Sequence, residues 1–442
     1  MLITTLHLRD FRCFADLEID FHEYLTVLVA PNSQGKTALL EAIGIALGTF
    51  VGAFDLGKSK HIQRTDARYS NRTGLQAEQK YPVSIAADLQ LSDGRLISIS
   101  RKLSGPKNKT TIKEAADLTK YGQELQEQIR QETRVTLPIV AYYSTARLWK
   151  AHNLLSNRKL LTTSRSLGYE DCLSSASSFS QVQAWIKKAT LAQLQTPQNT
   201  LGRALETIQG AVNQALHSEG WRNFHYNLGY EDLVMQREEQ EILPVNLLSD
   251  GTRTMISLIA DLAFRCVCLN GLSGLDSPLN SPGIVIIDEI DLHLHPRWQQ
   301  RVLHSLRQAF PKIQFIVTTH SPQVLSTVDR TSIRLLPQAI DDDLLTMHTE
   351  TPRWQTQGVS SADILAMVMG VDPVPDEEVS HQLSEYKALI QQNQQEAELT
   401  QRLRQGLEQH FGPEHPAIVD CDRLIRFQAF KHKVSQSSQS HA

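Results

Sequence analysis

The stretch GIVIIDEIDLHLHP, residues 283–296, joins a fully apolar run to a cluster of acids. Four apolar residues, Ile284 to Ile287, lead directly into Asp288 and Glu289. Such a run is typical of a parallel strand that is covered on both faces, and the ligand crevices of open α/β sheets lie at the carboxyl ends of these strands. The stretch therefore predicts an α/β fold with two carboxylates at the ligand-binding edge of its sheet. The alternative is an ordinary buried strand that ends in surface acids.

A second motif lies near the start of the chain, in LTVLVAPNSQGKTALLEAIGIAL, residues 25–47. It predicts a strand over 25–29 and a helix that begins near Lys36, with apolar residues at helical spacing. The connecting loop fits the phosphate-binding pattern GxxxxGK[ST], except that Ala30 stands where the first glycine belongs. A chance GKT sequence after a strand is the alternative, but the strand-loop-helix order favours a phosphate-binding loop.

The phosphate-binding loop assigns roles to individual residues. Backbone N–H groups of the loop and the helix N-terminus cradle phosphates, and Gly35 allows the close approach of the chain to a nucleotide. Lys36 is expected to reach the β- and γ-phosphates and Thr37 to bind Mg²⁺. The cofactors predicted from this loop are therefore ATP and Mg²⁺, and the loop residues expected to bind the nucleotide are Asn32, Ser33, Gly35, Lys36 and Thr37.

With this loop upstream, the acids of the first stretch gain a function. Asp288 is expected to hold Mg²⁺ together with Thr37, and Glu289 to orient and polarise the water that attacks the γ-phosphate. The nearby His293 and His295 have an i, i+2 spacing and no third ligand close by, which makes a separate metal site a poor interpretation. The pair of motifs predicts an ATPase.

Two further stretches present polar groups at element ends. Ser249, Asp250 and Gly251 form a turn before an apolar-periodic helix, and a hydroxyl, a glycine and a helix N-terminus together suit an anion. The predicted strand over 313–317 ends in Thr318, Thr319, His320 and Ser321. His320 is expected to contact the γ-phosphate or the attacking water, whereas a purely structural histidine is the alternative.

The order of these motifs resembles that of the ABC-type P-loop ATPases of the SMC and RecF-like branch. The resemblance implies an ATPase head with a mixed sheet, a short helical insert and a helical C-terminal region. It also implies that Ser249 and Gly251 form a signature motif facing the nucleotide of another subunit. Arg12 matches an arginine that often touches nucleotide in this branch. A Q-loop glutamine has no match in residues 137–149.

Within this branch the chain is most similar to the PtuA family, the ATPase subunits of Septu-type anti-phage systems, some of which are linked to retrons. That resemblance implies a homodimer or higher homo-oligomer that controls a separate HNH nuclease subunit, PtuB-like, and no nuclease site in this chain. Two alternatives stay open. One is a RecF-like DNA-repair ATPase that acts directly on DNA, and the other is an ATP-binding scaffold with little turnover.

The rest of the chain suggests a division into four parts. Residues 1–150 and 236–350 are expected to form the two halves of the ATPase head, 151–235 a helical insert, and 351–442 a helical tail for partner docking with a frayed end. Residues 81–102 predict a hairpin that turns at Asp93–Gly94, and 104–122 an exposed loop. In the tail, a stripe of four apolar residues indicates either a helix packed on its own head or a docking surface; its members are Leu399, Leu403, Leu407 and Phe411.

Composition limits the remaining functions. The 442 residues carry a net charge of −4 and five scattered cysteines, which fits a reduced, cytoplasmic protein without a global bias towards nucleic acid. No run of about 18 apolar residues occurs, so no membrane span is expected. The segment from Lys58 to Arg72 has five cations against one acid and is either a nucleic-acid contact or a solvated face.

Overall fold

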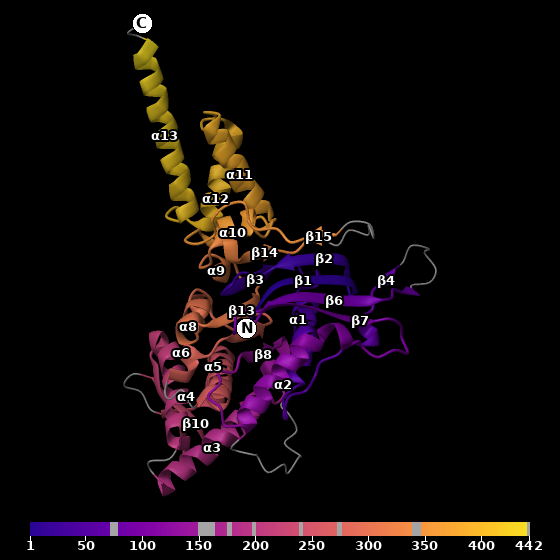
Figure 1. Ribbon diagram of the computed structural model, residues 1–442. Helices are drawn as coiled ribbons and strands as arrows, with labels where there is room; N and C mark the ends of the chain where they lie inside the picture. Colours follow the sequence, from indigo (N-terminus) through magenta and orange to yellow (C-terminus); the bar gives the residue numbers. More distant parts are fainter. Residues whose placement is uncertain are drawn as a thin grey trace. The chain divides into compact units, whose positions relative to one another are not determined.

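The computed structural model describes residues 1–70, 78–148, 164–174, 179–196, 200–237, 242–271, 276–337 and 346–439. The chain forms two compact units, Met1–Ile364 and Leu365–Ala442. The first unit contains the sheets and the sequence motifs, and the second is helical (Figure 1). The division of the chain into four parts stays a prediction.

A five-stranded parallel sheet forms the centre of the first unit. Its order is β14-β3-β13-β12-β8, and every neighbouring pair is parallel. The strands are β3 (Leu25–Val29), β8 (Ile139–Tyr143), β12 (Gly283–Ile287), β13 (Ile313–Thr318) and β14 (Ile333–Leu335). All residues of β3, β8, β12 and β13 are buried, because helices cover both faces of the sheet. The predicted strands at 25–29, 284–287 and 313–317 are confirmed.

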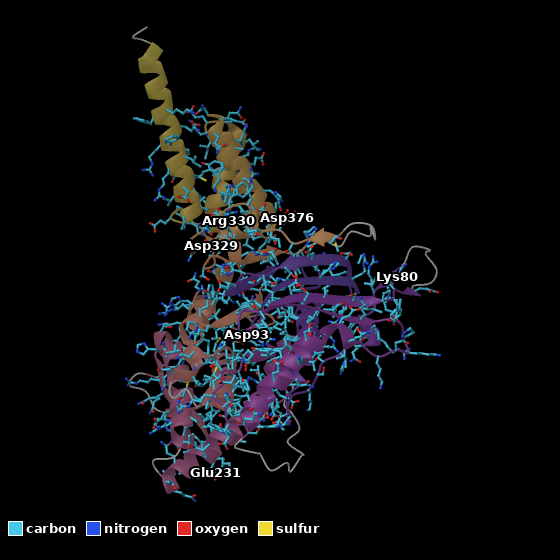
Figure 2. The ribbon with its side chains drawn as sticks, in the orientation of Figure 1. Lys80, Asp93, Glu231, Asp329, Arg330 and Asp376 are labelled. Carbon is cyan, nitrogen blue, oxygen red and sulfur yellow. The ribbon has the colours of Figure 1, made fainter. Side chains whose placement is uncertain are left out.

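A second five-stranded sheet has the order β15-β2-β1-β6-β7. Its strands are β1 (Leu2–Phe11), β2 (Phe14–Asp20), β6 (Val83–Gln90), β7 (Leu96–Leu103) and β15 (Met347–His348). All pairs are antiparallel except β15 with β2, so this sheet is mixed, as predicted. The hairpin of β6 and β7 turns at Asp93, labelled in Figure 2, whose carboxylate accepts a 3.0 Å hydrogen bond from the Arg95 N–H. Gly94 supplies the positive φ of 87° that this turn requires.

Helix α1 (Lys36–Val51) lies between the two sheets and contacts β6 and β7 on one side and β8 and β13 on the other. Helix α5 (Asp250–Asn270) packs on β8. Helix α2 (Ala116–Arg130) packs on α1 and β7, and it corrects the predicted exposed loop over 104–122 in its last part, 116–122. The buried residues of α2 include Leu118, Tyr121 and Leu125, a helical spacing that the charged residues around them concealed.

The remaining elements of the first unit complete its surface. Helices α3 (Phe179–Gln195) and α4 (Thr200–Leu216) pack against α5, and a small antiparallel sheet contains β9 (Trp221–Asn227), β10 (Asp232–Arg237) and β11 (Ile242–Pro244). Short elements are β4 (Tyr69–Ser70), β5 (Glu78–Gln79), α6 (Ser277–Asn280), α7 (Pro296–Gln299), α8 (Val302–Ala309) and α9 (Pro322–Leu325), while α10 (Ser361–Met367) includes the boundary between the two units. Across the described ranges, no helix combines the length and the apolar character needed to span a bilayer.

The second unit contains α11 (Glu378–Gln391), α12 (Glu398–Phe411) and α13 (Pro416–Gln439). Its core consists of five buried residues, Tyr386, Ile390, Leu407, Ile418 and Cys421. Leu403 and Phe411 pack against this core, whereas Leu399 is 53% exposed. The apolar stripe of α12 is therefore mainly core of this unit, which corrects its interpretation as a docking surface.

Three of the four cations in the described part of the Lys58–Arg72 segment, residues 58–70, lie close to acids. Lys58 pairs with Asp171 at 2.8 Å, Lys60 pairs with Glu41, and Arg68 is buried within 4.0 Å of Asp10. Arg72 lies outside the described residues. Arg64 is exposed, and the Lys58 side chain stays 66% exposed in its ion pair, so a nucleic-acid contact and a solvated face both stay open for this segment.

Candidate active site

The phosphate-binding loop connects β3 to α1 at the carboxyl edge of the parallel sheet. Gly35 precedes α1 with a φ of 86°, and a Cβ at this position would lie 2.4 Å from both Cys13 Sγ and Phe14 Cζ. Asn32 and Ser33 are exposed on the loop, and Ser33 also has a positive φ, of 64°. The turn between β1 and β2 and the start of β2 therefore pack against the loop and leave no space for a side chain at position 35.

Ala30 replaces the first glycine of the pattern without a conformational conflict. Its φ is not in the positive range that requires glycine, and its side chain is buried. The ammonium of Lys36 donates hydrogen bonds to the carbonyl oxygens of Ala30, at 2.8 Å, and Pro31, at 3.0 Å. Lys36 contacts the backbone carbonyl of residue 30 and not its side chain, so the methyl group of alanine leaves this hydrogen bond intact.

Lys36 is in an acidic and buried environment. It is only 7% exposed. Burial lowers the pKa of its ammonium, and the negative charges of Asp288, Glu289 and Asp291 oppose this effect. A cation that is buried beside three acids can exchange its present carbonyl partners for an anionic ligand at small cost in desolvation.

The carboxylate of Asp288 joins the loop to the neighbouring strands. Its Oδ2 accepts a 2.8 Å hydrogen bond from Thr37 Oγ1, and its Oδ1 accepts a 2.6 Å bond from Thr318 Oγ1. The Thr318 hydroxyl also accepts a 2.7 Å bond from the Glu289 N–H. Three motifs that are far apart in sequence therefore meet around one buried carboxylate, since their strands β3, β13 and β12 are adjacent.

Glu289 and His320 follow the ends of adjacent strands. Glu289 is half-buried and has a φ of 48°, a left-handed conformation that is uncommon for a non-glycine residue. His320 is half-buried directly after β13, and the preceding Thr319 donates a 2.6 Å hydrogen bond to Asp291. Strain of this kind clusters at functional sites. The structure thus places both proposed catalytic residues at the edge that carries Lys36, while their roles stay proposals.

Arg12 is attached to the segment before β4. Its Nε donates to Asp66 Oδ1 at 2.9 Å, and its backbone N–H donates to the Asp66 carbonyl at 2.7 Å. It follows β1 and precedes Cys13 and Phe14, the residues that touch the loop at Gly35. The guanidinium is therefore fixed by a buried acid, and one third of the Arg12 side chain is exposed.

The Ser249 turn begins α5 and packs against the segment after β12. The Ser249 hydroxyl caps the helix by accepting a 3.4 Å bond from the Thr252 N–H. A Cβ on Gly251 would lie 2.5 Å from the His293 carbonyl oxygen, so this glycine allows the turn to approach the chain after Glu289. Ser249 is exposed and available to a group outside this turn.

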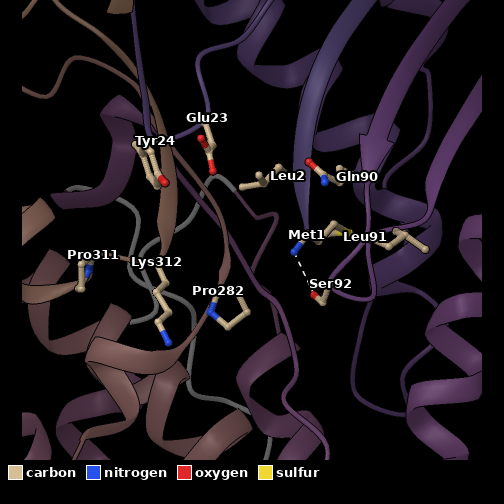
Figure 3. Close-up of a pocket in the computed structure, with 11 residues that line it drawn as sticks. Met1, Leu2, Glu23, Tyr24, Gln90, Leu91, Ser92, Pro282, Pro311 and Lys312 are labelled. Atoms are coloured by element: carbon tan, nitrogen blue, oxygen red, sulfur yellow. Dashed lines mark hydrogen bonds between the residues drawn. The ribbon is translucent and has the colours of Figure 1, made fainter.

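Two cavities in the described part of the chain lie at the opposite edge of the parallel sheet. One, of about 470 Å³, is lined by Tyr24, Pro282 and Lys312, which precede β3, β12 and β13 (Figure 3). The other, of about 510 Å³, includes Leu25 and Ser332 from the starts of β3 and β14. The predicted site residues follow the carboxyl ends of these strands, so neither cavity is the candidate active site.

The residues at the carboxyl edge fit ATP and Mg²⁺. Phosphates bound at the loop would lie near three features: Gly35 in a left-handed conformation, the buried Lys36 and the N-terminus of the long helix α1. Thr37 and Asp288 place a hydroxyl and a carboxylate oxygen together, and Mg²⁺ prefers hard oxygen ligands of this type beside substrate phosphates. When bound, Mg²⁺ would neutralise phosphate charge.

Two family models match the chain. An AAA domain matches residues 5–216, and an AAA domain whose description names the AbiEii toxin of type IV TA systems matches residues 177–326. Together these matches include the phosphate-binding loop and both acids after β12. The chain is an ABC-type P-loop ATPase. Its fold is that of an SMC head, as shown by an SmcHead bound to the C-winged helix domain of ScpA, with a TM-score of 0.51 and 13% identity over 79% of this chain and 98% of that one.

Relatives of the ATPase include proteins named as retron ATPases, as Septu proteins and as RecF. The retron Ec83 probable ATPase of Escherichia coli is 34% identical over 53% of this chain and 43% of its own length. The retron Vc95 probable ATPase of Vibrio cholerae is 24% identical over 92% of this chain and 87% of its own length. Septu protein PtuA of Bacillus mycoides is 51% identical over 17% of this chain and 10% of its own length. The chain thus spans less than half of the Ec83 relative.

The ATPase site contains residues to which the sequence motifs gave no role. Thr318 connects Asp288 to Glu289, and Phe14 and Cys13 support the loop at Gly35. Thr318 is the last residue of β13, two positions before His320, so its place at the end of a buried strand was a usable signal. Cys13 lies in the turn before β2 and Phe14 begins β2, in a different sheet from the loop, and only the three-dimensional packing brings them together.

His320→Ala should lower the turnover of the ATPase by roughly 100-fold, the usual contribution of a positioned polar catalytic group. Its effect on the melting temperature should be small, because the side chain is only half-buried. Steady-state ATP hydrolysis and thermal unfolding measure the two effects, and His304→Ala on the exposed surface of α8 is the control. A large loss of stability with normal turnover would make His320 a structural residue.

Proposed function

We propose that the ATPase is a dimeric switch whose nucleotide state controls a separate HNH nuclease in anti-phage defence. The observation that carries the proposal is the similarity to the retron Vc95 ATPase over 92% of this chain, together with the Septu protein PtuA match. The names of these relatives indicate the defence context. The nuclease partner comes from the resemblance to the Septu family.

The switch requires a nucleotide site that is shared between two copies. Lys36 and Thr37 of one copy would bind ATP, and Ser249 and Gly251 of the other would contact its phosphates. Two features support this arrangement, namely the exposed Ser249 at the start of a 21-residue helix and the close approach of Gly251 to His293. Bound ATP would then join two protein surfaces, and it can shift subunit packing by no more than its difference in affinity for the two arrangements.

A mixing experiment tests the shared site. Lys36→Ala removes the phosphate-binding cation, and Ser249→Arg places a bulky cation at the signature turn, so each variant alone should be inactive. Mixed dimers contain one site built from an intact loop and an intact signature turn, and they should regain ATP hydrolysis. Turnover that stays absent after subunit exchange, or a fully active Ser249→Arg variant, would contradict the shared site.

A co-expression experiment tests the control of a partner. The chain is produced with the product of its neighbouring gene, and the complex is purified with and without ATP. Nuclease activity that requires the partner and changes with ATP supports the switch. Cleavage by the chain alone, or a complex indifferent both to ATP and to Lys36→Ala, contradicts it. Strong salt-dependent binding of DNA by the isolated chain would favour direct action on DNA instead.

A further inference from the structure

Strand β8 lies at the edge of the parallel sheet and ends in two neighbouring tyrosines. Tyr142 pairs in register with Ile286 and Tyr143 with Ile287 of β12. The Asp288 N–H donates a 2.8 Å hydrogen bond to the Tyr143 carbonyl oxygen, so the end of β8 is attached to the backbone of the Mg²⁺-binding candidate. Since successive side chains of a strand point to opposite faces, the two tyrosines serve different sides of the sheet.

Tyr143 is directed to the α5 side. Its hydroxyl donates a 2.6 Å hydrogen bond to Asp261 Oδ2, and the same oxygen accepts a 2.8 Å bond from Arg265 Nε. Arg265 in turn donates to the Gly168 carbonyl oxygen at 2.8 Å. All three side chains are buried. Burial, and then the charge of Asp261, raise the pKa of Tyr143 well above its ordinary value, so the phenol keeps its proton and acts as the donor.

Tyr142 is directed to the α1 side. The Lys60 ammonium lies 4.8 Å from the centre of its ring and pairs with Glu41, which is one helical turn after Thr37. Burial raises the pKa of Tyr142, and the charges of Glu41 and Asp288 raise it further. The end of β8 therefore lies between the helix that follows the phosphate-binding loop and the helix that begins at the signature turn.

Because α5 is one continuous helix, the location of Asp261 in its middle also determines the location of Ser249 at its start. Asp261 lies in the middle of the helix and Ser249 caps its start, about three turns away. The buried network fixes the helix at Asp261, because a buried charge that loses a partner is costly. Tyr143 belongs to this network and also contacts Asp288, through its carbonyl oxygen.

We propose that Tyr143 is a positioning residue that sets α5, and with it the signature turn, relative to the Asp288 strand through its hydrogen bond to Asp261. The inference rests on the shared site of the proposed function. In this proposal Tyr143 does not contact ATP. Loss of its hydroxyl should therefore affect turnover in the assembled site and leave nucleotide binding by the loop of each subunit intact.

Tyr143→Phe keeps the ring and removes the hydroxyl, while Asp261 retains Arg265. We expect kcat to fall roughly tenfold, since hydrogen bonds to charged groups are the strong ones, and the affinity for an ATP analogue to stay within about twofold. In a Glu289→Gln background, ATP-driven association should require more protein than with native Tyr143. Steady-state kinetics, analogue titration and light scattering measure these three quantities.

Tyr169→Phe is the matched control. Tyr169 is fully buried beside α5 and donates one 2.7 Å hydrogen bond, but its partner is the Pro138 carbonyl oxygen. It should lose stability as Tyr143→Phe does and keep kcat. Equal kcat losses in both variants, an unchanged kcat in Tyr143→Phe, or a parallel loss of analogue binding would each overturn the inference. Ser249→Arg distinguishes the two proposals. A fully active Ser249→Arg variant contradicts the shared site itself. An inactive Ser249→Arg variant together with a normal kcat in Tyr143→Phe contradicts only the positioning role.

Discussion

Glu289→Gln should bind ATP and hydrolyse it at least roughly 100- to 1000-fold more slowly than the native chain. Glutamine preserves the shape of the side chain and removes the negative charge that would polarise the attacking water. The backbone at Glu289 is held by its N–H bond to Thr318, which the substitution leaves in place. Binding of ATP should be equal or tighter, because one of the three acids near Lys36 becomes neutral.

Single-turnover hydrolysis and equilibrium binding of ATP to Glu289→Gln measure these two effects separately. Glu219→Gln is the control, since Glu219 pairs with Arg301 at 3.4 Å in the 3₁₀ turn after α4 and carries the same chemical change. Native hydrolysis by Glu289→Gln would exclude the catalytic role. A joint loss of binding and folding would assign Glu289 to the structure of the strand end.

Gly35→Ala should abolish ATP binding at concentrations that saturate the native chain. Alanine at a φ of 86° costs about 1–2 kcal/mol, and its methyl group would also overlap Cys13 Sγ and Phe14 Cζ. The loop can relieve this overlap only by moving the start of α1, which carries Lys36 and Thr37. We expect an affinity at least roughly 100-fold lower, because the phosphates would lose several oriented donors.

Gly94→Ala provides a matched control for this prediction. Gly94 has nearly the same φ, 87°, but a Cβ there has no atom within 4 Å. Both variants carry the conformational cost, and only Gly35→Ala carries the overlap. Titration with a fluorescent ATP analogue and thermal unfolding compare them. Equal ATP affinities in the two variants would show that the packing behind the loop is unimportant.

The sequence allowed the parallel strands and the loop to be predicted because each is a local pattern. The run over 284–287, the GKT loop and the strand before Thr318 each contain their own signal, and the structure confirms these elements. Helix α2 was missed because its apolar residues are separated by charges. The family identification and the SMC-head fold followed from the order of the motifs, which is also a property of sequence.

The connections between elements could not be predicted in the same way. Tyr143 and Asp261 are 118 positions apart, and Thr37 and Asp288 are 251 apart. Nothing in the residue types of the segment from Lys58 indicated that its cations would pair with acids from other elements. Likewise, the stripe of α12 has the spacing of any buried helix face, and only the presence of α11 and α13 identifies its partners.

The strand order of the parallel sheet has a consequence for co-translational folding. Both sheet partners of β3, the strand before the phosphate-binding loop, come from residues 313–335. At a synthesis rate of about 5–20 residues per second, the strand waits roughly 15–60 s for them. The sheet of β1, β2, β6 and β7 can pair meanwhile, since it needs only the first 103 residues. ATP can therefore stabilise the chain only after Asp288 and β13 have been made, and the four apolar residues of β3 stay without their sheet partners until then.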